Sequence, residues 1–276
     1  MLENETKLLL LRQLVSGQCV SVNLSALSNA VRKHRNTVRK EVHELLRQKV
    51  INPPVCPFMG LYREYPLLVI VRADLPDEKR VRDWVAEDKQ IFAAYWSRRE
   101  EYNMLLFLYH KDVLAYQLWR ESLTEEHKIP PREMRLPSYS IYVSNQLMLK
   151  YDPSAPIGLM EAELNRGGKL EINGVTLREL QFRILKHLVS GDVFKINENL
   201  LSRELKIHRR TVMKHVDQLL KNGWILQPVC RFPDLLCPPN YVLAYSMVDI
   251  RKARERVTLA FQNDPHVSTA LRISIG

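Results

Sequence analysis

The clearest structural pattern in this chain is in residues 202–226, SRELKIHRRTVMKHVDQLLKNGWIL. The stretch predicts a short helix, a tight turn at Ile207-His208, and a longer amphipathic helix that stops at Asn222-Gly223. In the longer helix, apolar residues at i, i+4, i+7 and i+8 form one stripe that we expect to be buried. These residues are Val212, Val216, Leu219 and Leu220. Because the opposite face is basic and polar, the pattern is that of a helix-turn-helix whose second helix enters a DNA major groove.

The same pattern occurs earlier in the chain, displaced by 174 residues. HRNTVRKEVHELL at 34–46 matches HRRTVMKHVDQLL at 208–220, and the segments LVSG and PVC also occur in both copies. Between residues 14 and 58 the two copies share 20 of 45 positions, which is more than chance similarity between amphipathic helices would give. We therefore interpret the chain as a tandem repeat of long period, in which each repeat is a pair of domains.

The placement of charge supports this division of the chain. The 276 residues carry a formal net charge of +10. Residues 1–52 hold nine Lys and Arg against four Asp and Glu, residues 175–230 hold ten against five, and the remaining residues are neutral overall. All of the excess positive charge lies in the two repeated helical units, which indicates an electrostatic footprint for a polyanion.

The first unit is predicted to contain three helices. They span residues 5–16, 24–32 and 37–49, with Asn23 capping the second and Asn36 capping the third. In the first helix we expect Leu8, Leu11, Leu14 and Val15 to point inward, and in the third Val38, Val42, Leu45 and Leu46. Val50-Ile51 and the Pro-rich stretch after them predict a short strand and a wing-like connection. A plain three-helix bundle with a solvated basic face is the alternative.

From residue 66 the hydrophobic period changes. Buried strands are predicted at 67–71, 91–96, 104–109 and within 138–148, and helices at 77–88 and 112–126. We expect Val81, Trp84 and Val85 to face inward from the first of these helices, and Val113, Tyr116, Trp119 and Leu123 from the second. The order strand-helix-strand-strand-helix-strand is that of the ferredoxin-like sandwich.

These two parts together resemble the Lrp/AsnC family of prokaryotic transcription regulators, in which an N-terminal helix-turn-helix joins a βαββαβ effector and dimerisation domain. The stretch EEYNMLLFLYHKDVLAYQLW at 100–119 is similar to the strand-and-helix segment of the family. The family's turn glycine is absent, since Glu100 and Glu101 precede Tyr102. The resemblance covers residues 1–150 and part of 175–276. It implies a partner in double-stranded DNA, a homo-oligomer assembled through the ferredoxin-like domains, and a small-molecule effector.

The expected fold class is α+β, with two winged helix-turn-helix domains alternating with ferredoxin-like domains. The expected domains are a winged helix-turn-helix at 1–60, a ferredoxin-like domain at 64–150, a linker at 151–174, a second winged helix-turn-helix at 175–235, and a partial ferredoxin-like domain at 238–276. Within the linker we expect a short helix near 159–164.

The last domain is expected to be incomplete. Only a strand over 241–248, a helix over 251–261 and a strand over 267–275 are predicted there. Because a βαβ fragment leaves an open sheet edge, we expect it to borrow strands from another chain, or the native chain to extend beyond Gly276.

Twelve candidate DNA-contacting residues lie on or beside the two third helices. They are Arg35, Asn36, Thr37, Arg39, Lys40, His43, Arg209, Arg210, Thr211, Met213, Lys214 and His215. Residues kept in both copies (Arg35/Arg209, Thr37/Thr211 and Lys40/Lys214) are predicted to grip phosphates, and part of the differing set, which also includes Glu41 and Asp217, to meet base edges. A solvated basic face is the alternative for the shared residues. His34 and His208, at equivalent turn positions, favour a structural or phosphate-binding role.

Motifs for other chemistry are missing from the sequence. There is no phosphate-binding loop, dinucleotide fingerprint or H-E-x-x-H motif, so we predict no catalytic residues, no metal and no cofactor. The cysteines Cys19, Cys56, Cys230 and Cys237 lack C-x-x-C spacing and are expected to be small core residues. No apolar run reaches the ~18–20 residues of a membrane span and no signal peptide is evident. We therefore expect no membrane partner and a cytoplasmic, nucleoid-associated location.

The sequence favours a sequence-specific transcription regulator that binds double-stranded DNA through two heads per chain. Two alternatives remain. Some Lrp/AsnC-like proteins decarboxylate a sirohaem-type tetrapyrrole, an activity that would not require excess positive charge on each helical unit. A non-specific, chromatin-like DNA binder would show no preference among DNA sequences.

Overall fold

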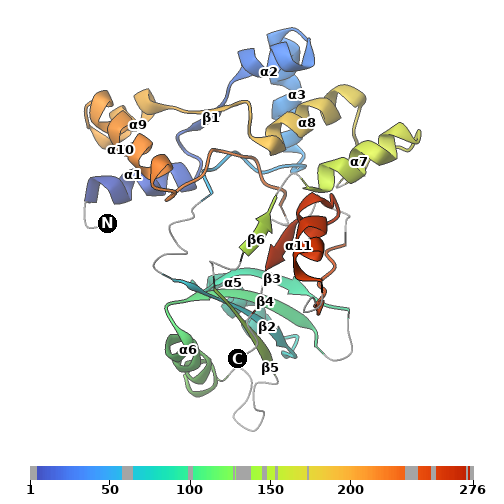
Figure 1. The fold of residues 1–276 in the computed structure, drawn as a ribbon. Helices are drawn as coiled ribbons and strands as arrows, with labels where there is room; N and C mark the ends of the chain where they lie inside the picture. The colour runs from blue at the N-terminus through green and yellow to red at the C-terminus, as the bar shows by residue number, and fades with distance from the viewer. Residues whose placement is uncertain are drawn as a thin grey trace. The chain divides into compact units, whose positions relative to one another are not determined.

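The computed structural model has a mixed α+β fold with small antiparallel sheets (Figure 1). It describes residues 5–57, 65–98, 102–126, 128, 138–144, 148–152, 155–172, 174–233, 242–249, 253–271 and 273. The chain divides into two compact units. Unit 1 comprises Met1–Met59 and Lys150–Ala270, and unit 2 comprises Gly60–Leu149 and Leu271–Gly276.

Six helices of unit 1 form two equivalent sets. The first set is α1 (Glu5–Val15), α2 (Leu24–Val31) and α3 (Arg35–Arg47), and the second is α8 (Glu179–Ser190), α9 (Glu198–Leu205) and α10 (Arg209–Lys221). The side chain of Asn23 accepts a hydrogen bond from the Ala26 N–H at 3.2 Å, so the predicted cap of α2 is confirmed. The predicted cap at Asn36 is wrong, because α3 already begins at Arg35 and is capped by His34.

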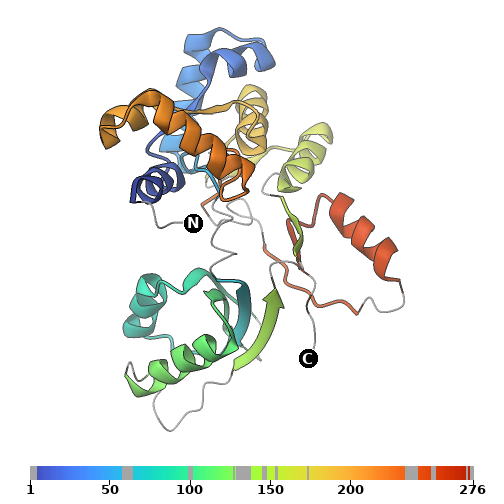
Figure 2. The ribbon, with the colours of Figure 1, turned by 60° about the vertical axis from the view of Figure 1, so that its left-hand side comes forward.

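The first helices are exchanged between the two sets. Helix α8 packs against α2 and α3, whereas α1 packs against α9 and α10 (Figures 1 and 2). We call the first assembly the α3 head (α2, α3 and α8) and the second the α10 head (α1, α9 and α10). The core of the α3 head includes Leu27, Val31, Val38, Val42, Leu45, Phe182, Ile184, Leu185, Leu188 and Val189. The core of the α10 head includes Leu10, Leu14, Leu201, Val212, Val216, Leu219, Trp224 and Ile225.

The chain crosses between the heads through two short paired strands. Strand β1 (Val20–Val22) runs antiparallel to β9 (Phe194–Ile196), with Ser21 opposite Lys195 at the centre of the register. On either side, the Asn23 N–H donates to the Val193 carbonyl and the Asn197 N–H donates to the Cys19 carbonyl, both at 2.7 Å. Each contact recurs with its partners exchanged and shifted by 174 residues, so the heads are related by an approximate two-fold axis.

The segments that follow the third helices join the heads to each other. Val55 and Val229 form an antiparallel bridge, in which each N–H donates to the other's carbonyl at 3.1 and 3.0 Å. This bridge occupies the place of the predicted wings. The short strand predicted at Val50-Ile51 is not formed, and both side chains are buried in the core of the α3 head.

Two glycines permit this close approach of backbones. Gly17 and Gly191 have φ angles of 79° and 81°, a conformation that a side chain would strain. A Cβ atom on Gly17 would lie 2.5 Å from the Pro54 carbonyl oxygen, and one on Gly191 would lie 2.7 Å from that of Pro228. The backbone therefore requires the glycine of the LVSG motif in both copies.

The cysteines that the structure describes are core residues, as predicted. Cys19, Cys56 and Cys230 are buried and form no disulfide, while Cys237 lies outside the described residues. Burial raises the pKa of the Cys56 thiol to about 12, and burial also raises the pKa of the Cys230 thiol. These thiols therefore stay protonated and behave as small apolar side chains.

The segment predicted as a linker packs on the α3 head. Helix α7 (Ala155–Asn165) is longer than the helix expected at 159–164, and the hairpin of β7 (Glu171–Ile172) and β8 (Val175–Thr176) follows it. Ile157, Met160 and Leu170 are buried in the core of the α3 head. The segment therefore extends that core.

Unit 2 contains a four-stranded antiparallel sheet of order β3-β4-β2-β5. Along the chain its elements are β2 (Leu67–Ala73), α5 (Lys79–Glu87), β3 (Ile91–Trp96), β4 (Met104–His110), α6 (Val113–Glu125) and β5 (Ser138–Ser144). These are the six elements expected from the sequence. Val81 and Tyr116 pack from the helices onto one face of the sheet. Val113, predicted to face inward, is the first residue of α6 and is 43% exposed, so that prediction is wrong.

A polar and aromatic cluster connects the two helices of unit 2 to the sheet. One carboxylate oxygen of Asp88 accepts from the indole N–H groups of Trp84 and Trp119, at 3.1 and 2.8 Å. His110 is buried against the rings of Tyr116 and Trp119. Its Nε2 has no hydrogen-bond partner among the described residues. Burial lowers the pKa of His110, although the charges of Asp88 and Asp112 oppose this.

The C-terminal region forms fewer strands than predicted. Helix α11 (Arg254–Asn263) and strand β10 (Thr269–Leu271) form, and β10 pairs with β6 (Met148–Tyr151). The strand predicted over 241–248 is not formed within the described residues 242–249, where Val242 is 87% exposed and no apolar face is buried. Among the helices that the structure describes, none is long and apolar enough to cross a membrane.

Candidate nucleic-acid interface

The third helices α3 and α10 each bury one stripe and expose the opposite face. Val38, Val42 and Leu45 of α3 are buried, as are Val212, Val216 and Leu219 of α10, whereas Leu46 and Leu220 are half-buried. Eleven of the predicted contact residues are exposed, namely Arg35, Asn36, Thr37, Arg39, Lys40, His43, Arg209, Arg210, Thr211, Met213 and Lys214. The predicted phosphate-gripping and base-reading residues are thus largely on the solvent side of their helices.

The N-termini of the two third helices have the same local geometry. Nδ1 of His34 accepts a hydrogen bond from the Asn36 N–H, and Nδ1 of His208 accepts from the Arg210 N–H, both at 3.2 Å. Each histidine therefore has the structural turn role considered from the sequence. An arginine follows each cap as the first helical residue, where the helix dipole favours an anion.

One open hollow lies on the exposed face of α10. Its volume is about 450 Å³, and it is lined by Arg210, Met213, Lys214, Asp217, Gln218 and Lys221. Three predicted contact residues are thus brought together there. Gln218 and Lys221 were missed as candidates, although their spacing of i+4 and i+7 from Lys214 places them on the same helical face.

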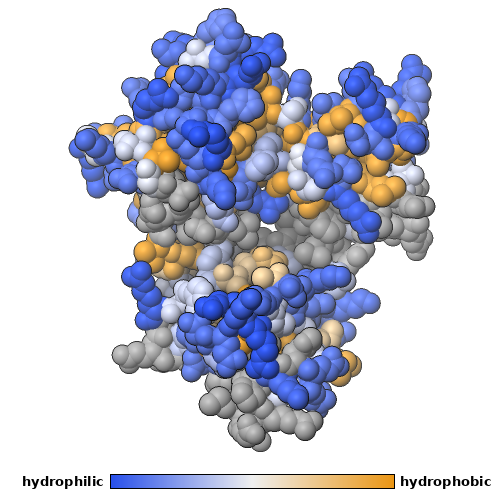
Figure 3. All heavy atoms as spheres, turned by 180° about the vertical axis from the view of Figure 1, so that it is seen from behind, coloured by the Kyte–Doolittle hydropathy of each residue, from blue (hydrophilic) through white to orange (hydrophobic). Residues whose placement is uncertain are grey.

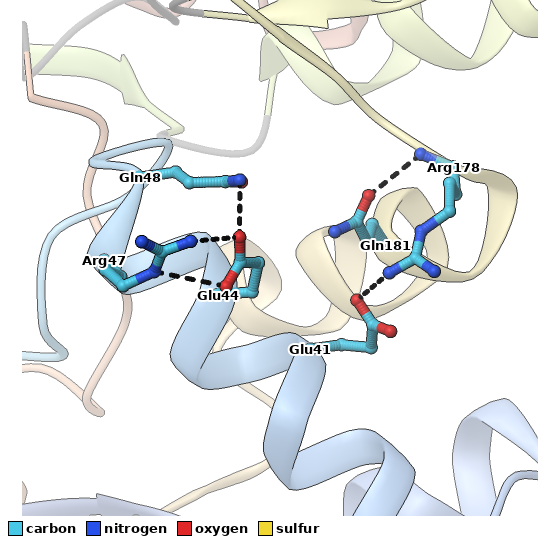
Figure 4. A network of polar contacts seen from close by, with 6 residues as sticks. All are labelled: Glu41, Glu44, Arg47, Gln48, Arg178 and Gln181. Atoms are coloured by element: carbon cyan, nitrogen blue, oxygen red, sulfur yellow. Dashed lines mark hydrogen bonds and ion pairs between the residues drawn. The ribbon is translucent and has the colours of Figure 1, made fainter.

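The corresponding part of α3 is internally paired. Glu44 accepts hydrogen bonds from Arg47 and Gln48, each at 2.6 Å (Figure 4). The hydrogen bond from Arg47 holds the pKa of the Glu44 carboxyl below its usual range. Because positions 218 and 221 are Gln and Lys, no equivalent ion pair can form on α10.

Two of the differing residues face the protein interior instead of solvent. Glu41 is 4% exposed and accepts a hydrogen bond from Nη2 of Arg178 at 2.5 Å (Figure 4). The amide oxygen of Gln181 in turn accepts from the Arg178 backbone N–H at 3.0 Å. At the position equivalent to Glu41, His215 is half-buried, and its Nδ1 is buried without a partner among the described residues. Glu41 therefore binds the N-cap residue of the exchanged helix α8 instead of facing solvent.

One face of the region that contains α2 and α3 is mainly polar. Figure 3 shows that the top of unit 1, where α2 and α3 lie in Figure 1, is mainly hydrophilic when seen from behind.

Within the described part of the chain, no group of three or more His, Cys, Asp or Glu side chains could hold a metal ion.

Comparisons with known proteins found no matching family model and no matching curated protein. Among solved structures, the chain is similar to a transcriptional regulator from Neisseria meningitidis in complex with L-Met (13% identity over 52% of this chain and 91% of that chain, TM-score 0.38). It is also similar to an AsnC family transcriptional regulator from Agrobacterium tumefaciens (16% identity, 50% and 88%, TM-score 0.37). A third is the leucine response regulatory protein of Mycobacterium tuberculosis (13% identity, 51% and 92%, TM-score 0.38).

Proposed function

We propose that this chain is a sequence-specific transcription regulator that binds double-stranded DNA with two helix-turn-helix heads, using α3 and α10 as recognition helices. The main support for this proposal is the placement of positive charge. The excess charge lies within the repeated units, and the shared cations Arg35, Lys40, Arg209 and Lys214 are exposed on the helices' solvent side. Such a surface attracts a polyanion, and phosphate contacts supply nearly all of the non-specific affinity and a large share of the specific affinity of DNA-binding proteins.

The approximate two-fold relation between the heads supports inverted half-sites. A two-fold pair of recognition helices matches the dyad of duplex DNA, with half-site centres about 34–36 Å apart when successive major grooves are used. The exposed faces differ, because Arg39 of α3 corresponds to Met213 of α10. Arg39 would read guanine through paired donors, whereas Met213 would contact a thymine methyl group. We therefore propose an imperfect palindrome as the operator.

Unit 2 is proposed to serve assembly or effector sensing. Its element order and its sheet order β3-β4-β2-β5 are those of a ferredoxin-like sandwich. The neighbour from Neisseria meningitidis was solved with L-Met, which suggests free amino acids as the first effectors to test. Residues 100 and 101, where the family's turn glycine is absent, lie outside the described residues.

Selection of bound sequences from a random duplex library with the full chain tests the proposal. We expect enrichment of an imperfect inverted repeat that shifts the protein in a binding assay. Binding without enrichment of any sequence would instead indicate a non-specific, chromatin-like binder. No binding to any duplex would reject the DNA-binding function.

A further inference from the structure

The two recognition helices begin with equivalent arginines in different surroundings. In the α10 head, Nε and Nη2 of Arg209 both donate to one carboxylate oxygen of Glu198, at 3.3 and 3.2 Å. In the α3 head, the position equivalent to Glu198 is Leu24, which packs against the core. No carboxylate among the described residues forms an ion pair with Arg35. Within the part of the chain that the structure describes, the same cation is therefore paired with a carboxylate in the α10 head and with none in the α3 head.

The ion pair between Glu198 and Arg209 should contribute little to the stability of the fold. The Arg209 side chain is 56% exposed and that of Glu198 is 28% exposed, and surface ion pairs contribute little to the free energy of unfolding. Its position matters more, because it lies where the N-terminus of α10 would meet a DNA phosphate. There, the carboxylate occupies two guanidinium donors and adds a negative charge that repels the phosphate.

We propose that Glu198 makes the two heads unequal in the strength of their contacts with DNA phosphates. This proposal rests on the DNA-binding function proposed above. The α3 head grips phosphate with a free Arg35, whereas Glu198 weakens the phosphate grip of the α10 head by competing for Arg209. The α3 head anchors the chain on any duplex. The α10 head depends more on its base contacts, so it discriminates more strongly among half-sites.

The test measures binding of the full chain to a mixed-sequence duplex at about 50 and 200 mM salt. Each added phosphate contact steepens the salt dependence by about 0.9 in logarithmic slope, so Glu198→Gln should raise the ratio of the two affinities about three- to fourfold. The matched control is Glu204→Gln, which removes an exposed carboxylate from the same helix without touching Arg209. We expect a smaller change in that control.

A double-mutant cycle shows whether Glu198 acts through the arginine. In an Arg209→Ala background, Glu198→Gln should change the salt dependence much less, by no more than the Glu204→Gln control, because only the repulsion between carboxylate and phosphate is left to remove. Arg35→Ala should cost more affinity than Arg209→Ala. Thermal unfolding of each variant checks that the heads stay folded. Equal effects of Glu198→Gln and Glu204→Gln would overturn the proposal, as would weaker binding after Glu198→Gln, which would mean that Glu198 holds Arg209 in place for DNA. If the unmodified chain binds no duplex, the DNA-binding function itself fails.

Discussion

Exchange of the first helices predicts that a substitution in one copy will destabilise the head that contains the other copy's recognition helix. Leu14 of α1 and Leu188 of α8 are equivalent positions, and both are fully buried. Leu14 lies in the core of the α10 head, and Leu188 lies in the core of the α3 head. Truncating a buried leucine to alanine costs about 3–5 kcal/mol through lost burial and the cavity left behind.

Native-state hydrogen exchange measures where that cost falls. Since about 1.4 kcal/mol is a factor of ten in an equilibrium constant, local protection should drop by at least roughly 100-fold. Leu188→Ala should deprotect α2 and α3, and Leu14→Ala should deprotect α9 and α10. If Leu188→Ala deprotected α9 and α10 instead, each copy would be folding on its own first helix and the exchange would be refuted. Equal loss of protection in both heads would contradict two separate cores.

Three further predictions concern single side chains. Arg39→Ala should weaken binding to the preferred site by roughly 1–3 kcal/mol and binding to a mismatched site by less. Lys40→Ala should weaken binding to both sites alike. Titration of each variant against the two duplexes measures both effects. Arg178→Ala should lower the free energy of unfolding, measured in denaturant, by about 1–2 kcal/mol, because the buried Glu41 carboxylate loses its hydrogen-bond partner. The 67% exposure of the Arg178 side chain limits the loss. An unchanged free energy would show that Glu41 has another hydrogen-bond partner. Burial lowers the pKa of His110, so the unfolded state binds more protons and the free energy of unfolding should fall as pH drops below about 6.5. His110→Phe should reduce that decline. An equal decline in the variant would show that His110 is not its cause.

Periodicity in the sequence was enough to predict which face of each third helix is buried and the six elements of unit 2. An amphipathic stripe specifies a buried face through local spacing alone. It does not specify the partner, and the first helices of both copies end in the same LVSG motif. The exchange therefore depends on tertiary contacts, such as the bond between Arg178 and Glu41, that join residues far apart in the chain.

Two elements differ from their predicted bounds for physical reasons. Asparagine is a stronger capping residue than histidine, which favours Asn36 as the cap of α3, yet the Asn36 backbone N–H donates to the His34 ring and the helix begins at Arg35. Helix α7 begins before the predicted 159–164 although Pro156 and Gly158 disfavour a helix there, because Ile157 and Met160 are buried against the α3 head. For the candidate site, exposure of the predicted residues followed from helical geometry, whereas the ion pair of Arg209 with Glu198 needed coordinates.

Salt dependence of DNA binding most directly tests the claim that both heads grip a duplex. We predict that the affinity of the full chain for duplex DNA falls at least tenfold between low and physiological salt, because several phosphates are neutralised. Lys40→Ala and Lys214→Ala should each reduce the logarithmic slope by about 1. An affinity that does not change with salt, or a slope altered by only one of the two substitutions, would contradict binding through both heads.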